Sequence, residues 1–61
     1  MPTVHIHMYE GRTKEQKRNL VKNVTDAIVK SLDVKPEAVT IFLHEISKEN
    51  VAKAGKIVAE A

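Results

Sequence analysis

The sequence has no cysteine and few aromatic residues, and these absences exclude several classes of function. Without cysteine there is no disulfide, no thiolate zinc site and no cysteine nucleophile. One phenylalanine and one tyrosine offer little surface for stacking on nucleic-acid bases. The apolar runs are far shorter than a signal segment or a membrane span of roughly 20 residues. We therefore expect a soluble, cytoplasmic protein that does not contact a membrane.

The chain is also short, with 61 residues, and we expect residues 1–61 to form a single domain. A domain near this size buries only about 60% of the surface that its unfolded chain exposes. Small domains usually compensate with disulfides, a structural metal or association with other subunits. Because disulfides are excluded, self-association is the expected source of the missing stability.

The sequence also lacks a large excess of either charge, since ten Lys and Arg residues and eight Asp and Glu residues give a net charge of +2. Lys14, Arg18 and Lys22 form a row at helical spacing. Glu15 and Asp26 flank that row, which favours a solvated helix face over a nucleic-acid patch. We expect no nucleic-acid partner.

Side-chain periodicity predicts the first two elements. Residues 3–9 alternate between two side-chain types, which is typical of a strand. Thr13 and Gln16 have the spacing of a capping box, in which each side chain bonds the other residue's backbone N–H. Apolar residues then recur at helical spacing, which predicts a helix over residues 14–32.

A second strand is predicted over residues 39–46, which are rich in β-branched and aromatic side chains. It follows a break at Pro36, because proline disfavours helical geometry in the residue before it. Strand, helix and strand in this order predict an α/β fold: one βαβ unit with two parallel strands and a right-handed crossover. Residues 51–61 have no clear pattern, and Gly55 is their only strong turn signal.

The two faces of this sheet differ in character. The residues expected to pack against the helix are Val4, Ile6, Met8, Val39, Ile41 and Leu43. The residues expected on the opposite, uncovered face include His5, His7, Tyr9, Thr40 and Phe42. Because two strands with one face in water are not independently stable, we expect a dimer that extends the sheet to four strands.

Three histidines raise the question of a metal site, since His5, His7 and His44 could supply a three-histidine zinc centre. Metal ligation requires all three nitrogens within about 2 Å of one point. We place His7 near the middle of the first strand and His44 towards the end of the second, which separates them. Packing or interface histidines are therefore favoured, and no metal is expected.

Arg12 follows Glu10 and Gly11 at the carboxyl end of the first strand. Ligands tend to bind at this end of strands in βαβ units, and a guanidinium binds a carboxylate through two parallel hydrogen bonds. Arg12 is therefore a candidate ligand residue, and an ordinary surface arginine is the alternative.

Pro2 is the third candidate, because a small second residue permits removal of Met1. Removal would make the nitrogen of Pro2 a secondary amine. An α-amino group titrates near pH 7.7–8.0, and an apolar pocket or a nearby cation such as Arg12 would disfavour its charged form. The neutral amine is suited to act as a general base.

Taken together, Pro2, the His5–His7 segment, the Glu10–Arg12 turn and Glu15–Lys17 resemble the 4-oxalocrotonate tautomerase family. The resemblance runs from Pro2 to about Asn50. It implies a βαβ protomer, a dimer with a four-stranded sheet, and commonly a hexamer built as a trimer of dimers. It also implies cofactor-free interconversion of enol and keto forms of a small carboxylate substrate such as 2-hydroxymuconate. Pro2 would move the proton, and Arg12 would bind the carboxylate.

Two positions depart from that family. Thr40 stands where well-known members have a second arginine, and Val51 stands where they have an active-site phenylalanine. Two alternatives therefore remain. One is a hydrolytic, dehalogenase-type relative, which needs an acidic residue to activate water and for which Glu45 is only a poor candidate, and the other is a non-catalytic oligomeric binding module.

Overall fold

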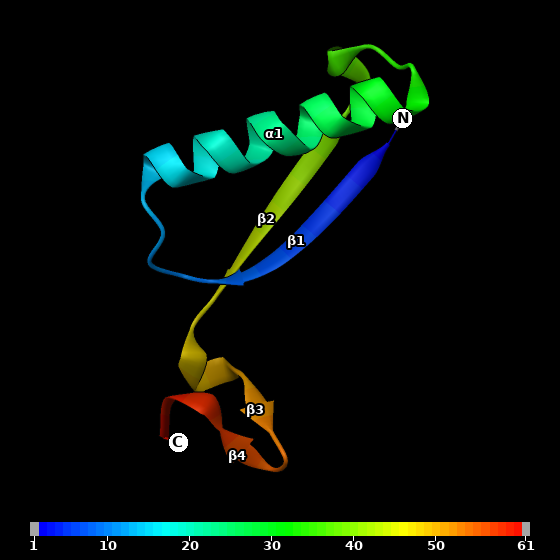
Figure 1. Ribbon diagram of the computed structural model, residues 1–61. Coiled ribbons are helices and arrows are strands. Elements are labelled where there is room, and N and C mark those ends of the chain that lie inside the picture. Colours follow the sequence, from blue (N-terminus) through cyan, green and yellow to red (C-terminus); the bar gives the residue numbers. More distant parts are fainter. Residues whose placement is uncertain (1, 61) are drawn as a thin grey trace.

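The computed structural model describes residues 2–60, and its first three main elements form a βαβ unit (Figure 1). Strand β1 spans Thr3–Tyr9, helix α1 spans Lys14–Leu32 and strand β2 spans Thr40–Ile46. The predicted bounds of β1 and α1 are confirmed, and β2 begins one residue later than predicted. The α/β fold class with two parallel strands and a crossover helix is confirmed.

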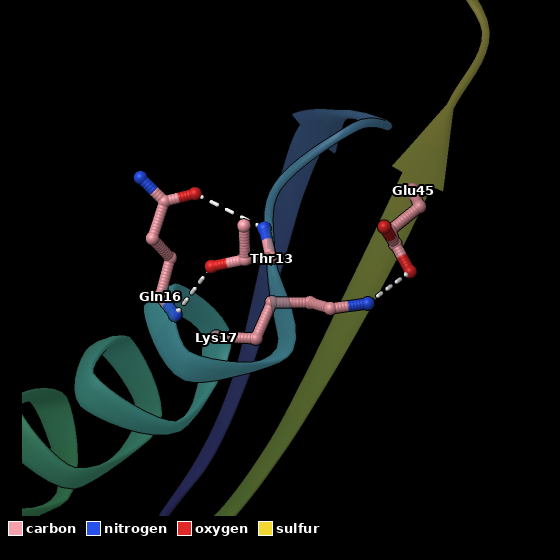
Figure 2. A network of polar contacts seen from close by, with 4 residues as sticks. All are labelled: Thr13, Gln16, Lys17 and Glu45. Atoms are coloured by element: carbon pink, nitrogen blue, oxygen red, sulfur yellow. Dashed lines mark hydrogen bonds and ion pairs between the residues drawn. The ribbon is translucent and has the colours of Figure 1, made fainter.

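The start of α1 is fixed by the predicted capping box (Figure 2). The backbone N–H of Gln16 donates to the hydroxyl of Thr13 at 3.1 Å, and the backbone N–H of Thr13 donates to the side-chain oxygen of Gln16 at 3.0 Å. One turn further on, the Lys17 ammonium donates to the Glu45 carboxylate at 2.9 Å, which ties α1 to β2. These contacts satisfy free backbone donors at the helix start and set its position over the sheet.

The end of α1 has a different cause from the one predicted. Asp33 adopts a left-handed conformation with φ of 55°, and its N–H donates to the carbonyl of Val29 at 2.9 Å. A left-handed residue of this kind is a common helix terminator. Pro36 instead begins a separate 3₁₀ turn, Pro36–Ala38, which leads into β2.

The sheet places its residues on the two predicted faces. Because β1 and β2 are parallel with Thr3 opposite Thr40, partners along the two strands share a face. The side that α1 covers carries Val4, Ile6, Met8, Ile41, Leu43 and Glu45. The open side carries Thr3, His5, His7, Tyr9, Thr40, Phe42, His44 and Ile46.

The tail that lacked a sequence pattern forms a small hairpin beyond the carboxyl ends of the two main strands (Figure 1). Strands β3 (Ala52–Lys53) and β4 (Lys56–Ile57) are antiparallel. The two residues between them both have positive φ, 52° at Ala54 and 78° at Gly55, as tight hairpin turns require. In Figure 1 the hairpin extends away from α1 and the sheet.

Over the described residues, a single copy of this chain buries little of its surface. Among residues 2–60, no side chain is fully buried. The accessible surface is 5023 Å², whereas a compact monomer of 6.8 kDa exposes about 4,000 Å². The radius of gyration is 14.7 Å, against about 10.5 Å for a compact domain of this length. This shape supports the expectation that the chain is stabilised by association.

Candidate active site

Pro2 lies at the start of β1, beside the first residue of β2. Its carbonyl oxygen accepts a hydrogen bond of 3.0 Å from the backbone N–H of Thr40, and its side chain is partly exposed. The main chain of Pro2 is therefore held by the sheet, and its neighbour there, Thr40, carries no charge. Met1, whose removal the general-base hypothesis requires, lies outside the described residues.

Arg12 lies in the loop between β1 and α1, and its side chain is exposed. The loop is held on both sides, because the N–H of Glu10 donates to the carbonyl of Ile46 at 3.0 Å and Thr13 caps the helix. Between them, Gly11 has φ of 111°, a conformation that other residues rarely adopt. The backbone thus presents Arg12 at the carboxyl end of the sheet.

Pro2 and Arg12 do not meet within one copy of the chain. They flank β1 at opposite ends, and a seven-residue strand separates its ends by about 20 Å at 3.3 Å per residue. Figure 1 shows the start of β1 near the end of α1, and the loop into α1 at the far end of the strand. The expectation that Arg12 acts as a nearby cation on Pro2 is therefore wrong for a single copy.

The three histidines, in contrast, lie together. His7 is directly opposite His44 in the register of the sheet, so the expected separation along the strands is wrong. The ring nitrogens His5 Nδ1 and His44 Nε2 are 2.8 Å apart, a hydrogen bond. Within residues 2–60 no group of three His, Cys, Asp or Glu side chains could hold a metal ion.

A depression of about 270 Å³ lies at the carboxyl ends of the strands and is lined mainly from the open face. Most of its lining is apolar, and the residues that form it are His7, Met8, Tyr9, Ile46 and Val51. The Lys48 ammonium sits 5.4 Å from the centre of the Tyr9 ring, within cation–π range. Sequence reasoning singled out Val51 but missed Tyr9 and Ile46. The preference of ligands for this end of parallel strands was the signal that could have identified them.

Comparison with known proteins supplies the family. The pattern of the family described as tautomerase enzyme matches residues 2–61. The chain belongs to the tautomerase family. The 2-hydroxymuconate tautomerase of Bacillus subtilis (strain 168) is 43% identical to it over 60 residues, which cover 98% of this chain and 97% of that relative. This tautomerase is thus homologous to an isomerase over nearly its whole length.

Solved structures agree with the fold. The crystal structure of YwhB, a homologue of 4-oxalocrotonate tautomerase, superimposes with a TM-score of 0.92 at 42% identity and covers 98% of both chains. A heterohexameric 4-oxalocrotonate tautomerase from Chloroflexus aurantiacus J-10-fl superimposes with a TM-score of 0.88 at 30% identity, covering 98% of this chain and 97% of its own. Among the helices of residues 2–60, none combines the length and apolar character that crossing a membrane requires.

Proposed function

We propose that this tautomerase interconverts the enol and keto forms of a 2-hydroxydienoate or related 2-oxo acid, such as 2-hydroxymuconate, without a cofactor. Once Met1 is removed, the amine of Pro2 takes the proton of the 2-hydroxyl group, and the resulting ammonium returns it to a distant carbon of the conjugated system. The substrate then leaves as the conjugated ketone, with no net gain or loss of atoms. The near full-length match to a 2-hydroxymuconate tautomerase is the observation that carries this proposal.

The position of Pro2 supports its role as the base. The Pro2 carbonyl is bonded to Thr40, so the free amine would have a fixed direction relative to the sheet. Fixed placement of a reacting group lowers the entropic part of the barrier. General-base catalysis by a positioned amine contributes about 10²–10⁴-fold in rate.

The opposite placement of Pro2 and Arg12 supports an active site formed between two copies. A two-fold dimer that pairs the two β1 edges antiparallel, centred on Ile6, would set Pro2 opposite Glu10 of the other copy. Adjacent strands are about 4.8 Å apart, so the amine would lie close to the loop that carries the second copy's Arg12. Such a pairing also gives the four-stranded sheet expected from the sequence.

The same pairing would bring Pro2 to the depression at the second copy's strand ends. Its mainly apolar lining would favour the neutral amine, because desolvation disfavours the charged form. The Arg12 guanidinium would bind the substrate carboxylate through two hydrogen bonds. With neutral Thr40 beside Pro2, Arg12 is the residue we assign to carboxylate binding.

No observation favours the hydrolytic alternative. It needs a carboxylate to activate water, and Glu45 was the residue that the sequence analysis offered for this role. The Glu45 side chain lies on the face that α1 covers and is bonded to Lys17 at 2.9 Å (Figure 2). Its carboxylate therefore serves the contact between helix and strand.

The experiment is ultraviolet monitoring of 2-hydroxymuconate ketonisation, with intact mass confirming that Met1 is absent. Pro2→Ala replaces the secondary amine by a primary one and is expected to lower kcat/KM, whereas a chain that retains Met1 has no amine at Pro2 and should lose the full general-base contribution of about 10²–10⁴-fold. Arg12→Ala is expected to lower kcat/KM mainly through KM, because it removes binding of the carboxylate. Arg18→Ala removes an exposed arginine of α1 that does not line the depression, and it is the matched control with expected unchanged activity. Full activity of the chain that retains Met1 would refute the assignment of the base.

A further inference from the structure

The depression at the strand ends has a lysine beside it whose charge is not neutralised. Lys48 opens the 3₁₀ turn that follows β2, and its ammonium lies 5.4 Å from the centre of the Tyr9 ring. Tyr9 in turn lines the depression. Lys48 forms no ion pair with a carboxylate of residues 2–60, whose ion pairs involve other lysines. An unpaired cation therefore stands at the wall of the depression.

The fold itself places Lys48 at this wall. Ile46, the last residue of β2, is opposite Tyr9 in the register of the sheet, so the turn after β2 starts level with the Tyr9 ring. The Ser47 hydroxyl closes this turn by accepting the N–H of Glu49 at 3.2 Å. An aromatic face attracts a cation. The ring therefore holds the end of a flexible side chain whose backbone the turn has already fixed.

Arg12 supplies a second unpaired cation at the same end of the sheet. It lies in the loop after β1, its side chain is exposed, and it forms no ion pair within residues 2–60. Lys48 occupies the corresponding place after β2. The last residues of both strands line the depression, so each cation comes from a segment that continues directly from one of its walls.

These features together define the chemistry of a matching ligand. A mainly apolar depression favours burial of a carbon chain. An ammonium or a guanidinium beside it favours a carboxylate through charge-assisted hydrogen bonds. Two unpaired cations from two segments therefore match a ligand that carries a carboxylate at each end of an unsaturated chain. A monocarboxylate would fill the depression but leave one cation unpaired.

We propose that Lys48 binds a second carboxylate of the substrate, and that Tyr9 is the positioning residue that holds the Lys48 ammonium at the depression. The inference rests on the proposed function, in which Arg12 binds the other carboxylate. It narrows the substrate class from 2-oxo acids in general to unsaturated dicarboxylates. The substrate 2-hydroxymuconate has this form.

Equilibrium binding of two unreactive acids to the chain that begins at Pro2 tests the proposal. The acids trans,trans-muconate and sorbate share one conjugated carbon chain, and sorbate has a methyl group where muconate has its second carboxylate. We expect the wild type to bind muconate about tenfold more tightly, the order expected for hydrogen bonds to a charged group. Lys48→Gln keeps a polar side chain but removes the charge, so it should abolish this preference and leave the affinity for sorbate unchanged.

The same variant should affect catalysis through substrate binding. Lys48→Gln is expected to raise KM for 2-hydroxymuconate about tenfold with kcat near the wild-type value, because Lys48 takes no part in the proton transfer. Lys48→Arg keeps the charge and should recover most of the KM. A change in kcat alone would contradict a role in carboxylate binding.

Variants of Tyr9 separate the positioning of Lys48 from a general role as a wall. Tyr9→Phe keeps the ring face and should keep the preference for muconate. Tyr9→Leu keeps an apolar wall without a ring, so it should lose most of the preference and still bind sorbate. In a double-mutant cycle, Tyr9→Leu should add little to Lys48→Gln. Lys30→Gln removes the same charge from an exposed position on α1 and is the matched control with the wild-type preference.

The outcomes separate this inference from the proposed function. A wild type without a preference for muconate, or a Lys48→Gln variant that keeps the preference, overturns the role of Lys48. An equal loss of affinity for both acids in Lys48→Gln overturns it as well, and a preference retained in Tyr9→Leu overturns the positioning role. Absence of ketonisation with the preference intact would remove the proposed function alone. Ketonisation without the preference would remove this inference alone.

Discussion

At the scale of single residues, Pro2 and Arg12 differ in how far local sequence could define their roles. The sequence predicted both the start of the first strand, where Pro2 lies, and the turn after that strand, which carries Arg12. The structure places both residues at these positions. The distance between the two residues could also have been calculated from the predicted length of β1. What the local pattern could not supply is the second copy that we propose to join them, because the contact depends on a symmetric edge rather than on neighbours in sequence.

The helix cap gives a residue-scale prediction. Thr13→Ala removes the acceptor for the Gln16 N–H, and loss of such a cap costs about 1 kcal/mol. Thermal unfolding at fixed protein concentration should show a lower Tm for Thr13→Ala. Ser31→Ala, which changes an exposed helical residue to a better helix former, should keep the Tm or raise it slightly. Equal Tm values for Thr13→Ala and the wild type would contradict the role of the cap.

The turn of the hairpin between β3 and β4 gives a second prediction at the residue scale. Ala54 has φ of 52°, a left-handed conformation that is unfavourable for alanine by about 1 kcal/mol. Ala54→Gly relieves this strain, so a stability gain of a few tenths to about 1 kcal/mol is expected after the entropy of the added glycine is subtracted. Gly55→Ala, at φ of 78°, should destabilise. Denaturant titration of both variants checks the opposite signs, and a loss for Ala54→Gly would show that the turn is not strained.

At the scale of elements, the contact between α1 and β2 contains one cross-element ion pair. The side chains of Lys17 and Glu45 are 27% and 36% exposed, so solvent screens their attraction. Exposed pairs are typically worth about 0.2–1 kcal/mol. A double-mutant cycle with Lys17→Ala and Glu45→Ala should give a coupling free energy in that range that falls with added salt. A salt-independent coupling of several kcal/mol would contradict a solvated pair.

The main elements were predictable because each has a strong period. Alternation in Thr3–Tyr9 and the capping box at Thr13 needed no tertiary information. The hairpin was missed because its strands have two residues each, too few for a period to appear. The clustering of the three histidines was missed because the sequence alone does not give the register of the two strands. The bond between Thr40 and the Pro2 carbonyl starts both strands at one level, so residues equally far along them, His7 and His44, become neighbours.

At the scale of the whole molecule, stability and activity should both depend on assembly. With no fully buried side chain in the part of the chain that the structure covers, an isolated copy is expected to be unstable. Association makes unfolding depend on protein concentration. Scanning calorimetry over a hundredfold range of concentration should show Tm rising with concentration. A constant Tm would mean that one copy folds alone.

A mixing experiment tests whether Pro2 and Arg12 act from different copies. Pro2→Ala and Arg12→Ala should each have little activity alone, but a mixed dimer would contain one site with both native residues. Random reassociation of equal amounts should therefore restore about a quarter of the wild-type activity for a two-fold dimer. If both residues served the same site from one chain, mixing would restore nothing.

The central claim is that the free amine of Pro2 is the base of this tautomerase. A chain of this length can be made by total chemical synthesis in two forms, one beginning at Pro2 and one that keeps Met1. In the second form the Pro2 nitrogen is an amide and cannot accept a proton. The rate of 2-hydroxymuconate ketonisation should be at least about 10²-fold higher for the form that begins at Pro2. Equal rates for the two forms would contradict the claim.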